Sequence, residues 1–259
     1  MILVRILSGL ALLLASAMPV AHAGEALVAV ASNFAEPADR LAQAFQDATG
    51  HTITISTGST GRLYTQIVQG APFDAFLAAD TVRPERLENE GLAIAGSRTT
   101  YAIGRLAVWD RLPDSTAASP LQRLIDGDYR RLAIANPELA PYVAAAMSVL
   151  RDRLEVADAS SARQVLGENI GQTFTFVATG NADLGLVALS QLRGRGEALG
   201  GRYCVIPAGW HAPIRQQAVL LTRGSGNAAA QAWMTFLASE EAAAILDAFG
   251  YDVEADGTP

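Results

Sequence analysis

Residues 52–79 read TITISTGSTGRLYTQIVQGAPFDAFLAA, and an α/β fold can be recognised from them. Residues 52–57 are mostly β-branched, and apolar and hydroxyl side chains alternate in them with a period of two, which predicts a strand. Residues 62–69 have helical spacing and stop at Gly70. Residues 74–79 form a short apolar run, which fits a buried strand. A strand, a helix and a second strand in this order are typical of a parallel sheet that helices cover.

The same alternation continues on both sides of this stretch. Upstream, residues 27–31 (LVAVA) predict a buried strand, and the helix that follows stops at Gly50. Downstream, residues 99–110 form a longer β-like run that Gly104 interrupts. Further strands are expected at residues 131–135, 184–189 and 216–222, with helices at 141–154, 172–179, 228–238 and 240–249. No low-complexity linker separates the halves, as expected if continuous strands join two lobes.

Composition sets the scale of the fold and excludes some partners. The chain has 259 residues, of which 50% are hydrophobic, so it can bury a large core in one α/β unit or in two lobes of about 100 residues each. Its formal net charge of −7 argues against a nucleic-acid partner, because phosphate binding needs a basic surface. Cys204 is the single cysteine, so an intrachain disulfide and a cysteine-based zinc site are both excluded.

The first 23 residues have the features of a signal peptide. Arg5 supplies a positive charge, residues 6–17 form a short apolar segment, and Ala21, His22 and Ala23 form an A-x-A cleavage site. The apolar segment is too short for a membrane span. We therefore expect an exported, periplasmic protein that begins at Gly24.

Four polar motifs lie in loops that lead into predicted helices, three of them directly after a predicted strand. They are residues 31–34 (ASNF), 56–61 (STGSTG), 136–142 (NPELAPY) and 167–171 (GENIG). Loops at the carboxyl ends of strands surround the binding crevice of α/β sheets, and helix N-termini attract anions. These positions therefore predict an anion site.

Each motif alone also fits a purely structural role. Ser32 and Asn33 are good N-caps, and Tyr142 would also fit a packed surface position. The glycine- and hydroxyl-rich loop 56–61 also fits a plain turn, and it lacks the Gly-Lys-Ser/Thr of a phosphate-binding Walker loop. Ile170 offers a ligand only its backbone N–H.

Taken together, these motifs and the segment GAPFDAFLAAD at residues 70–80 resemble the periplasmic molybdate-binding proteins, the receptors of ABC importers. The resemblance runs over essentially the whole chain after the leader. It implies a type II periplasmic-binding-protein fold: two α/β lobes with mostly parallel sheets flanked by helices, joined by two crossover strands. Lobe I would then comprise residues 24–104 and 216–259, and lobe II residues 105–215.

The resemblance also implies the contacts to the oxyanion. They fall on Ser32 or Asn33, on Ser59 or Thr60, on Tyr142, and on the backbone N–H of Ile170. Where some members place a tyrosine in the strand at residues 184–189, this chain has Ala188, and Tyr142 can supply the missing hydroxyl. No catalytic residue, cofactor or direct metal ligand is implied. The expected partners are molybdate or tungstate and a membrane permease, and the protein is expected to act as a monomer.

The chemistry of these donors agrees with a fully deprotonated oxyanion. A buried dianion needs many hydrogen bonds in place of its water, and hydroxyl, amide and N–H groups supply them. Hydrogen phosphate would bring a donor of its own, and no proposed ligand side chain is a carboxylate that accepts it, so we expect it to be rejected.

Two alternatives remain at this stage. The first is a receptor for another oxyanion such as sulfate. The second is an enzyme on the same fold, because a fold does not determine a function. Against an enzyme, the sequence shows no Ser-His-Asp arrangement, no H-E-x-x-H and no G-x-S-x-G.

Overall fold

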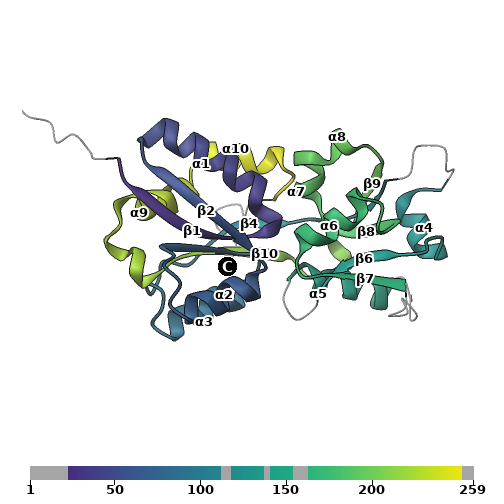
Figure 1. Ribbon diagram of the computed structural model, residues 1–259, viewed down its shortest axis with the longest axis horizontal. Coiled ribbons are helices and arrows are strands. Elements are labelled where there is room, and N and C mark those ends of the chain that lie inside the picture. The colour runs from purple at the N-terminus through teal and green to yellow at the C-terminus, as the bar shows by residue number, and fades with distance from the viewer. Residues whose placement is uncertain (1–22, 112–117, 137–140, 154–162, 253–259) are drawn as a thin grey trace, which may run out of the picture.

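The molecule consists of two lobes that lie side by side (Figure 1). The computed structural model describes residues 23–111, 118–136, 141–153 and 163–252. The expected leader therefore lies outside the described residues, except for Ala23, and so do residues 137–140 of the third motif. Among the described residues, no helix has the length and apolar character needed to cross a bilayer.

Each lobe is built on a five-stranded sheet. The first sheet has the order β2-β1-β3-β10-β4, with β1 (Glu25–Ala31), β2 (Thr52–Gly58), β3 (Ala75–Ala78), β4 (Thr99–Gly104) and β10 (Ile214–Leu220). The second has the order β7-β6-β8-β5-β9, with β5 (Leu106–Asp110), β6 (Leu132–Ala135), β7 (Gln164–Gly167), β8 (Leu184–Ala188) and β9 (Arg202–Val205).

Both sheets are mostly parallel, as expected. In the first sheet β1 is parallel to β2 and β3, and β10 is antiparallel to both of its neighbours. In the second sheet β6 is parallel to β7 and β8, and β5 is antiparallel to both of its neighbours. One strand in each sheet thus runs against the other four. The α/β two-lobed fold is confirmed.

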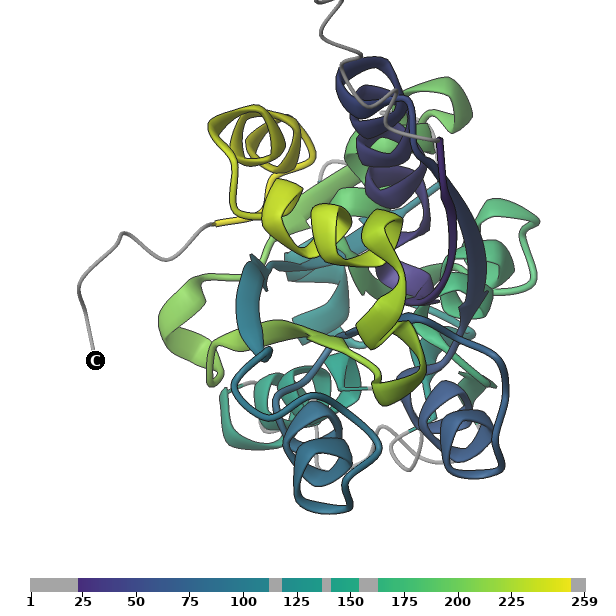
Figure 2. The ribbon, with the colours of Figure 1, turned by 90° about the vertical axis from the view of Figure 1, so that its left-hand side faces the viewer.

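Helices cover both faces of each sheet. The first lobe contains η1 (Ser32–Phe34), α1 (Ala35–Thr49), α2 (Thr60–Val68), α3 (Val82–Asn89), η6 (Thr222–Gly226), α9 (Ala228–Phe236) and α10 (Glu240–Ala248). The second contains α4 (Pro120–Asp126), α5 (Tyr142–Ser148), η2 (Val149–Arg153), α6 (Ile170–Ala178), α7 (Leu189–Gln191), η4 (Leu192–Gly196) and α8 (Glu197–Leu199). Figure 2, an end-on view of the first lobe, shows α1, α9 and α10 on one side of its sheet and α2 and α3 on the other.

The side chains of β1 alternate between the two faces of the sheet, which explains why helices pack on both faces. Val28 and Val30 point into the core that contains Phe45 of α1, whereas Ala29 points to the opposite face and packs in the core with Leu63 of α2. Side chains of a strand alternate between faces, so an all-apolar strand is buried on both sides.

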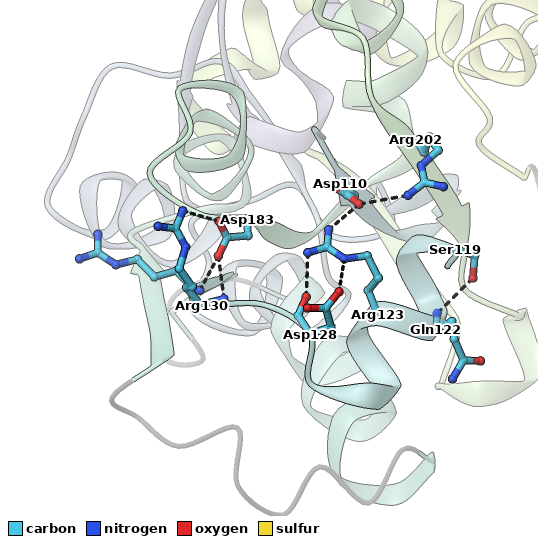
Figure 3. A network of polar contacts seen from close by, with 9 residues as sticks. Asp110, Ser119, Gln122, Arg123, Asp128, Arg130, Asp183 and Arg202 are labelled. Atoms are coloured by element: carbon cyan, nitrogen blue, oxygen red, sulfur yellow. Dashed lines mark hydrogen bonds and ion pairs between the residues drawn. The ribbon is translucent and has the colours of Figure 1, made fainter. Parts of the chain in front are cut away.

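A buried ion-pair network joins three elements of the second lobe (Figure 3). Arg123 of α4 donates to Asp110 of β5 at 2.6 Å and to Asp128 at 3.0 Å, and Arg202 of β9 lies 3.5 Å from Asp110. The Asp110 side chain is fully buried. A buried carboxylate has to be paired, so the network ties α4 to β5 and β9.

The chain crosses between the lobes twice. β4 ends at Gly104 and β5 begins at Leu106, so a nearly continuous strand makes the first crossing. The return runs from β9 through η5 (Ala208–Trp210) into β10, which begins at Ile214, two residues earlier than expected.

Candidate functional site

A small pocket lies between the lobes. Its walls are formed by Ala31, Ser32, Asn33, Thr60, Ala79, Pro141, Tyr142, Asn169 and Ile170. Its volume is about 10 Å³, close to the space that one water molecule requires. A tetrahedral oxyanion therefore requires the surrounding loops or lobes to move slightly apart.

Four helical segments begin at this pocket. The segment formed by η1 and α1 starts at Ser32, α2 at Thr60, α5 at Tyr142 and α6 at Ile170. The first turn of a helix has N–H groups without intrahelical partners and a partial positive charge. None of the residues in the pocket wall carries a formal charge. The pocket is thus suited to an anion that is held by dipoles and hydrogen bonds.

Ser59 and Thr60 have different positions in the structure. Ser59 is the N-cap of α2, and its Oγ accepts a hydrogen bond from the N–H of Arg62 at 3.3 Å. Thr60 lines the pocket, and its Oγ1 accepts from the N–H of Ala79 at 3.3 Å. Because Oγ1 acts as an acceptor there, its hydrogen remains available for a ligand. Ser59 is buried but is not part of the pocket wall.

The side chain of Asn33 is used inside the protein. Its Nδ2 donates to Oε1 of Gln216 at 2.8 Å and to Oη of Tyr251 at 3.0 Å. An amide nitrogen has two hydrogens, so both are occupied. At the first motif, Ser32 is the other polar side chain in the pocket wall.

Tyr142 extends from α5 toward the crossover. Its ring is buried, and its Oη accepts a hydrogen bond from Nε2 of Gln216 at 3.1 Å. A Cβ atom at Gly104 would overlap this hydroxyl and would also lie 2.7 Å from Nε2 of Gln216. The glycine at the first crossing thus makes room for the tyrosine.

The fourth motif forms the cap of α6. Oδ1 of Asn169 accepts from the N–H of Gln172 at 2.9 Å, and Ile170 is the first helical residue. A Cβ atom at Gly171 would lie 3.4 Å from Cβ of Ser32, so the first and fourth motifs meet across the lobes. An exposed ion pair between Arg62 of α2 and Glu168 of the fourth motif, at 3.3 Å, also joins the two lobes. Such a pair contributes little to stability.

Three buried tyrosines stay neutral around the pocket. Burial raises the pKa of Tyr101 and of Tyr142 well above the usual 10.0, and it raises the pKa of Tyr251 to about 12. Their hydroxyls therefore keep their hydrogens throughout the neutral and mildly alkaline range.

These raised pKa values predict loss of stability at alkaline pH. The folded state holds its tyrosine protons more tightly than the unfolded state, so the stabilisation is complete below about pH 10 and is lost as pH rises toward 12. We expect the free energy of unfolding in urea to be flat from pH 7 to pH 9 and to fall above pH 10. Tyr251→Phe should reduce that fall, and an unchanged slope in this variant would contradict the prediction.

A second, larger cavity adjoins the small pocket. Its volume is about 570 Å³, and it shares Ala79 and Pro141 with the small pocket. Its charged residues are Asp80, Arg83, Arg86 and Arg215. Arg83 pairs with Asp80 and Arg86 pairs with Glu90, so the charges of these two arginines are largely compensated by carboxylates.

Two other residues singled out from the sequence lie elsewhere. Ala188 is buried in β8 and is not part of the wall of the small pocket. Cys204 lies in β9 opposite Val108 of β5. Within the described part of the chain, no group of three His, Cys, Asp or Glu side chains is placed to hold a metal ion.

Four polar residues next to the pocket belong to none of the four sequence motifs. Tyr101, Ser190, Gln216 and Tyr251 are buried and joined by hydrogen bonds to one another or to Asn33. The one available signal was a glutamine or tyrosine inside an otherwise apolar strand pattern, as in QQAVLLT at residues 216–222.

Comparison with known proteins agrees with this geometry. Residues 26–252 match the family described as bacterial extracellular solute-binding protein. The molybdate-binding protein ModA of Azotobacter vinelandii is 45% identical over 237 residues, which cover 90% of this chain and 92% of that protein. ModA of Rhodobacter capsulatus is 42% identical over 247 residues, or 95% of each chain.

Solved structures show the same relationship. The periplasmic molybdate-binding protein of Azotobacter vinelandii superposes with a TM-score of 0.82 and 38% identity, covering 89% of this chain and all of that one. The sulfate-binding protein SubI of Mycobacterium tuberculosis, with a TM-score of 0.73 and 12% identity over 88% of this chain and 86% of that one, shares the fold alone. The chain therefore belongs to the bacterial extracellular solute-binding proteins and, within them, to the family of the periplasmic molybdate-binding proteins.

Proposed function

We propose that this protein binds molybdate, and also tungstate, in the small pocket between its lobes and delivers it to the permease of an ABC importer. The observation that carries the proposal is the convergence of four helix N-termini on a pocket without charged side chains. The identity of 45% and 42% to two molybdate-binding proteins supports molybdate as the oxyanion.

In this proposal both lobes donate to the oxyanion. Ser32, with the N–H of Asn33, and the hydroxyl of Thr60 act from the first lobe, while the hydroxyl of Tyr142 and the N–H of Ile170 act from the second. Ser59 contributes by capping α2. A ligand held from both sides stabilises the closed arrangement of the lobes.

The remaining expectations belong to the same proposal. Residues 1–23 are the leader of an exported protein, and the lobes comprise residues 24–104 with 216–259 and residues 105–215. The protein acts as a monomeric receptor without cofactor or catalytic activity. Sulfate is the rival ligand, since a sulfate-binding protein has the same fold.

Thermal unfolding with four anions tests the ligand. Residues 24–259 would be heated with molybdate, tungstate, sulfate or phosphate at matched concentration. At about 100 times its dissociation constant a ligand adds roughly 2.7 kcal/mol, which corresponds to roughly 5–10 °C for a protein of this size. We expect this shift with molybdate and tungstate, and no shift with hydrogen phosphate, whose O–H finds no carboxylate in the pocket wall.

Three other results of this experiment would contradict parts of the proposal. A sulfate shift equal to that of molybdate would make the protein a receptor for another oxyanion. A phosphate shift of the same size would contradict the argument from the unpaired O–H. If none of the four anions shifts the transition, the proposed site is wrong.

A further inference from the structure

The amide of Gln216 links two residues of the pocket wall. Its Oε1 accepts from Nδ2 of Asn33 at 2.8 Å and from Oη of Tyr101 at 3.1 Å. Its Nε2 donates to Oη of Tyr142 at 3.1 Å. The side chain is fully buried, so no bulk water replaces these partners.

A bulge in the first sheet places this amide. Gln216 of β10 lies opposite Ala102 of β4, whereas Gln217 lies opposite Thr100, so Tyr101 is an extra residue in β4. Bulges redirect side chains and are frequent beside functional sites. Gln216 is also two residues beyond the start of β10, the strand that completes the second crossing. Its amide therefore reaches Asn33 in one lobe and Tyr142 in the other.

The hydrogen bonds fix the orientation of the amide. Rotating it by 180° would set its NH₂ group against the NH₂ group of Asn33, so Oε1 stays on that side and Nε2 faces Tyr142. The oxygen of Tyr142 then accepts from Gln216, and its single hydrogen is left to donate. The Tyr142 hydroxyl can also donate this hydrogen to the neutral hydroxyl of Tyr251. A dianion is the stronger acceptor of the two.

We propose that Gln216 is a positioning residue of the ligand pocket: its N–H holds the Tyr142 hydroxyl as a hydrogen-bond donor toward the oxyanion. The inference rests on the proposed function, in which Tyr142 contacts the ligand. It extends that function to a residue that does not line the pocket.

Gln216→Glu tests this role with the smallest change of shape. A carboxylate still accepts from Asn33 and Tyr101, but it no longer donates to Tyr142 and instead takes the tyrosine hydrogen for itself. We expect molybdate binding, measured by calorimetry, to weaken about tenfold or more. Gln217→Glu is the matched control: this half-buried neighbour bonds to Arg98 and Thr100, and the same added charge should leave the affinity within about twofold.

A double-mutant cycle separates positioning from a merely structural effect. Because Gln216 acts through the tyrosine hydroxyl, Gln216→Glu should weaken binding only about twofold in a Tyr142→Phe background. The same tenfold loss in both backgrounds would overturn the inference, and so would an unchanged affinity of Gln216→Glu. If Gln216→Glu does not fold, Gln216→Met takes its place in the same double-mutant cycle with Tyr142→Phe.

The cycle also distinguishes this inference from the proposed function. If Tyr142→Phe binds molybdate as tightly as the unaltered protein, the assignment of Tyr142 to the site fails, and the inference fails with it. If Tyr142→Phe weakens binding and the two substitutions are additive, the site stands and only the role of Gln216 is refuted.

Discussion

Replacing Ile170 by proline is expected to weaken molybdate binding by roughly 10- to 150-fold, the equivalent of one lost hydrogen bond to a charged ligand, about 1.5–3 kcal/mol. Proline removes the backbone N–H of Ile170, which lines the pocket and is proposed to donate to the oxyanion. It is well tolerated as the first residue of a helix, which is the position of Ile170 in α6. The preceding residue, Asn169, has φ −152° and ψ 173°, extended backbone as proline requires of its neighbour.

Ile170→Val is the matched control for this substitution. Valine is close to proline in size and keeps the N–H, so its affinity for molybdate should stay within a few-fold of that of the unaltered protein. Calorimetric titration measures both affinities, and circular dichroism of the ligand-free variants checks that the helical content is unchanged. Equal affinities of the proline and valine variants would remove the Ile170 N–H from the site.

Gly104→Ala should reduce both the affinity for molybdate and the free energy of unfolding. The added Cβ overlaps the hydroxyl of Tyr142 and approaches Nε2 of Gln216. Gly104, Tyr142 and Gln216 are all buried, so neither side chain can move out into solvent. Overpacking a buried site costs about 1–3 kcal/mol of stability. The displaced tyrosine hydroxyl should weaken molybdate binding by about tenfold or more, since it can no longer hold its hydrogen bonds.

Gly226→Ala is the matched control for this effect. A methyl group added at Gly226 would meet no neighbouring side chain or distant backbone atom within 4 Å, and the φ angle of Gly226 is not in the left-handed region, so alanine fits there. Urea unfolding and calorimetry on both variants measure the two effects. A Gly104→Ala variant with the stability and affinity of Gly226→Ala would show that Tyr142 and Gln216 do not depend on the space at the crossing.

Much of the fold was predictable from local patterns. The β-branched alternation of residues 52–57 and the apolar run at 74–79 correspond to β2 and β3, and the glycines that follow the predicted helices mark real helix ends, as Gly50 does with φ 75°. Helix starts were less accurate: α6 begins at Ile170 instead of residue 172. Asn169 caps α6 ahead of the residues in which a helical periodicity becomes visible in the sequence, which explains the difference.

The sequence by itself determined the α/β class and the four loops that carry the pocket, and its resemblance to a known family implied the two lobes. These properties depend on short-range patterns: periodicity, caps and motifs within a few residues of one another. The resemblance to the molybdate-binding proteins, in turn, implied contacts at Ser32 or Asn33, at Ser59 or Thr60, at Tyr142 and at Ile170. The structure brings all of these except Ser59 together in one pocket wall.

Only the tertiary structure decided how the polar groups are shared. It places Thr60 on the pocket wall with Ser59 as a cap, it uses the Asn33 amide inside the protein, and it sets Gln216 between the lobes. The hydrogen bonds of Gln216 to Asn33 and to Tyr142 join residues 183 and 74 positions apart. Such bonds leave no local trace, because each partner is chosen by the packing of strands and helices that are distant along the chain.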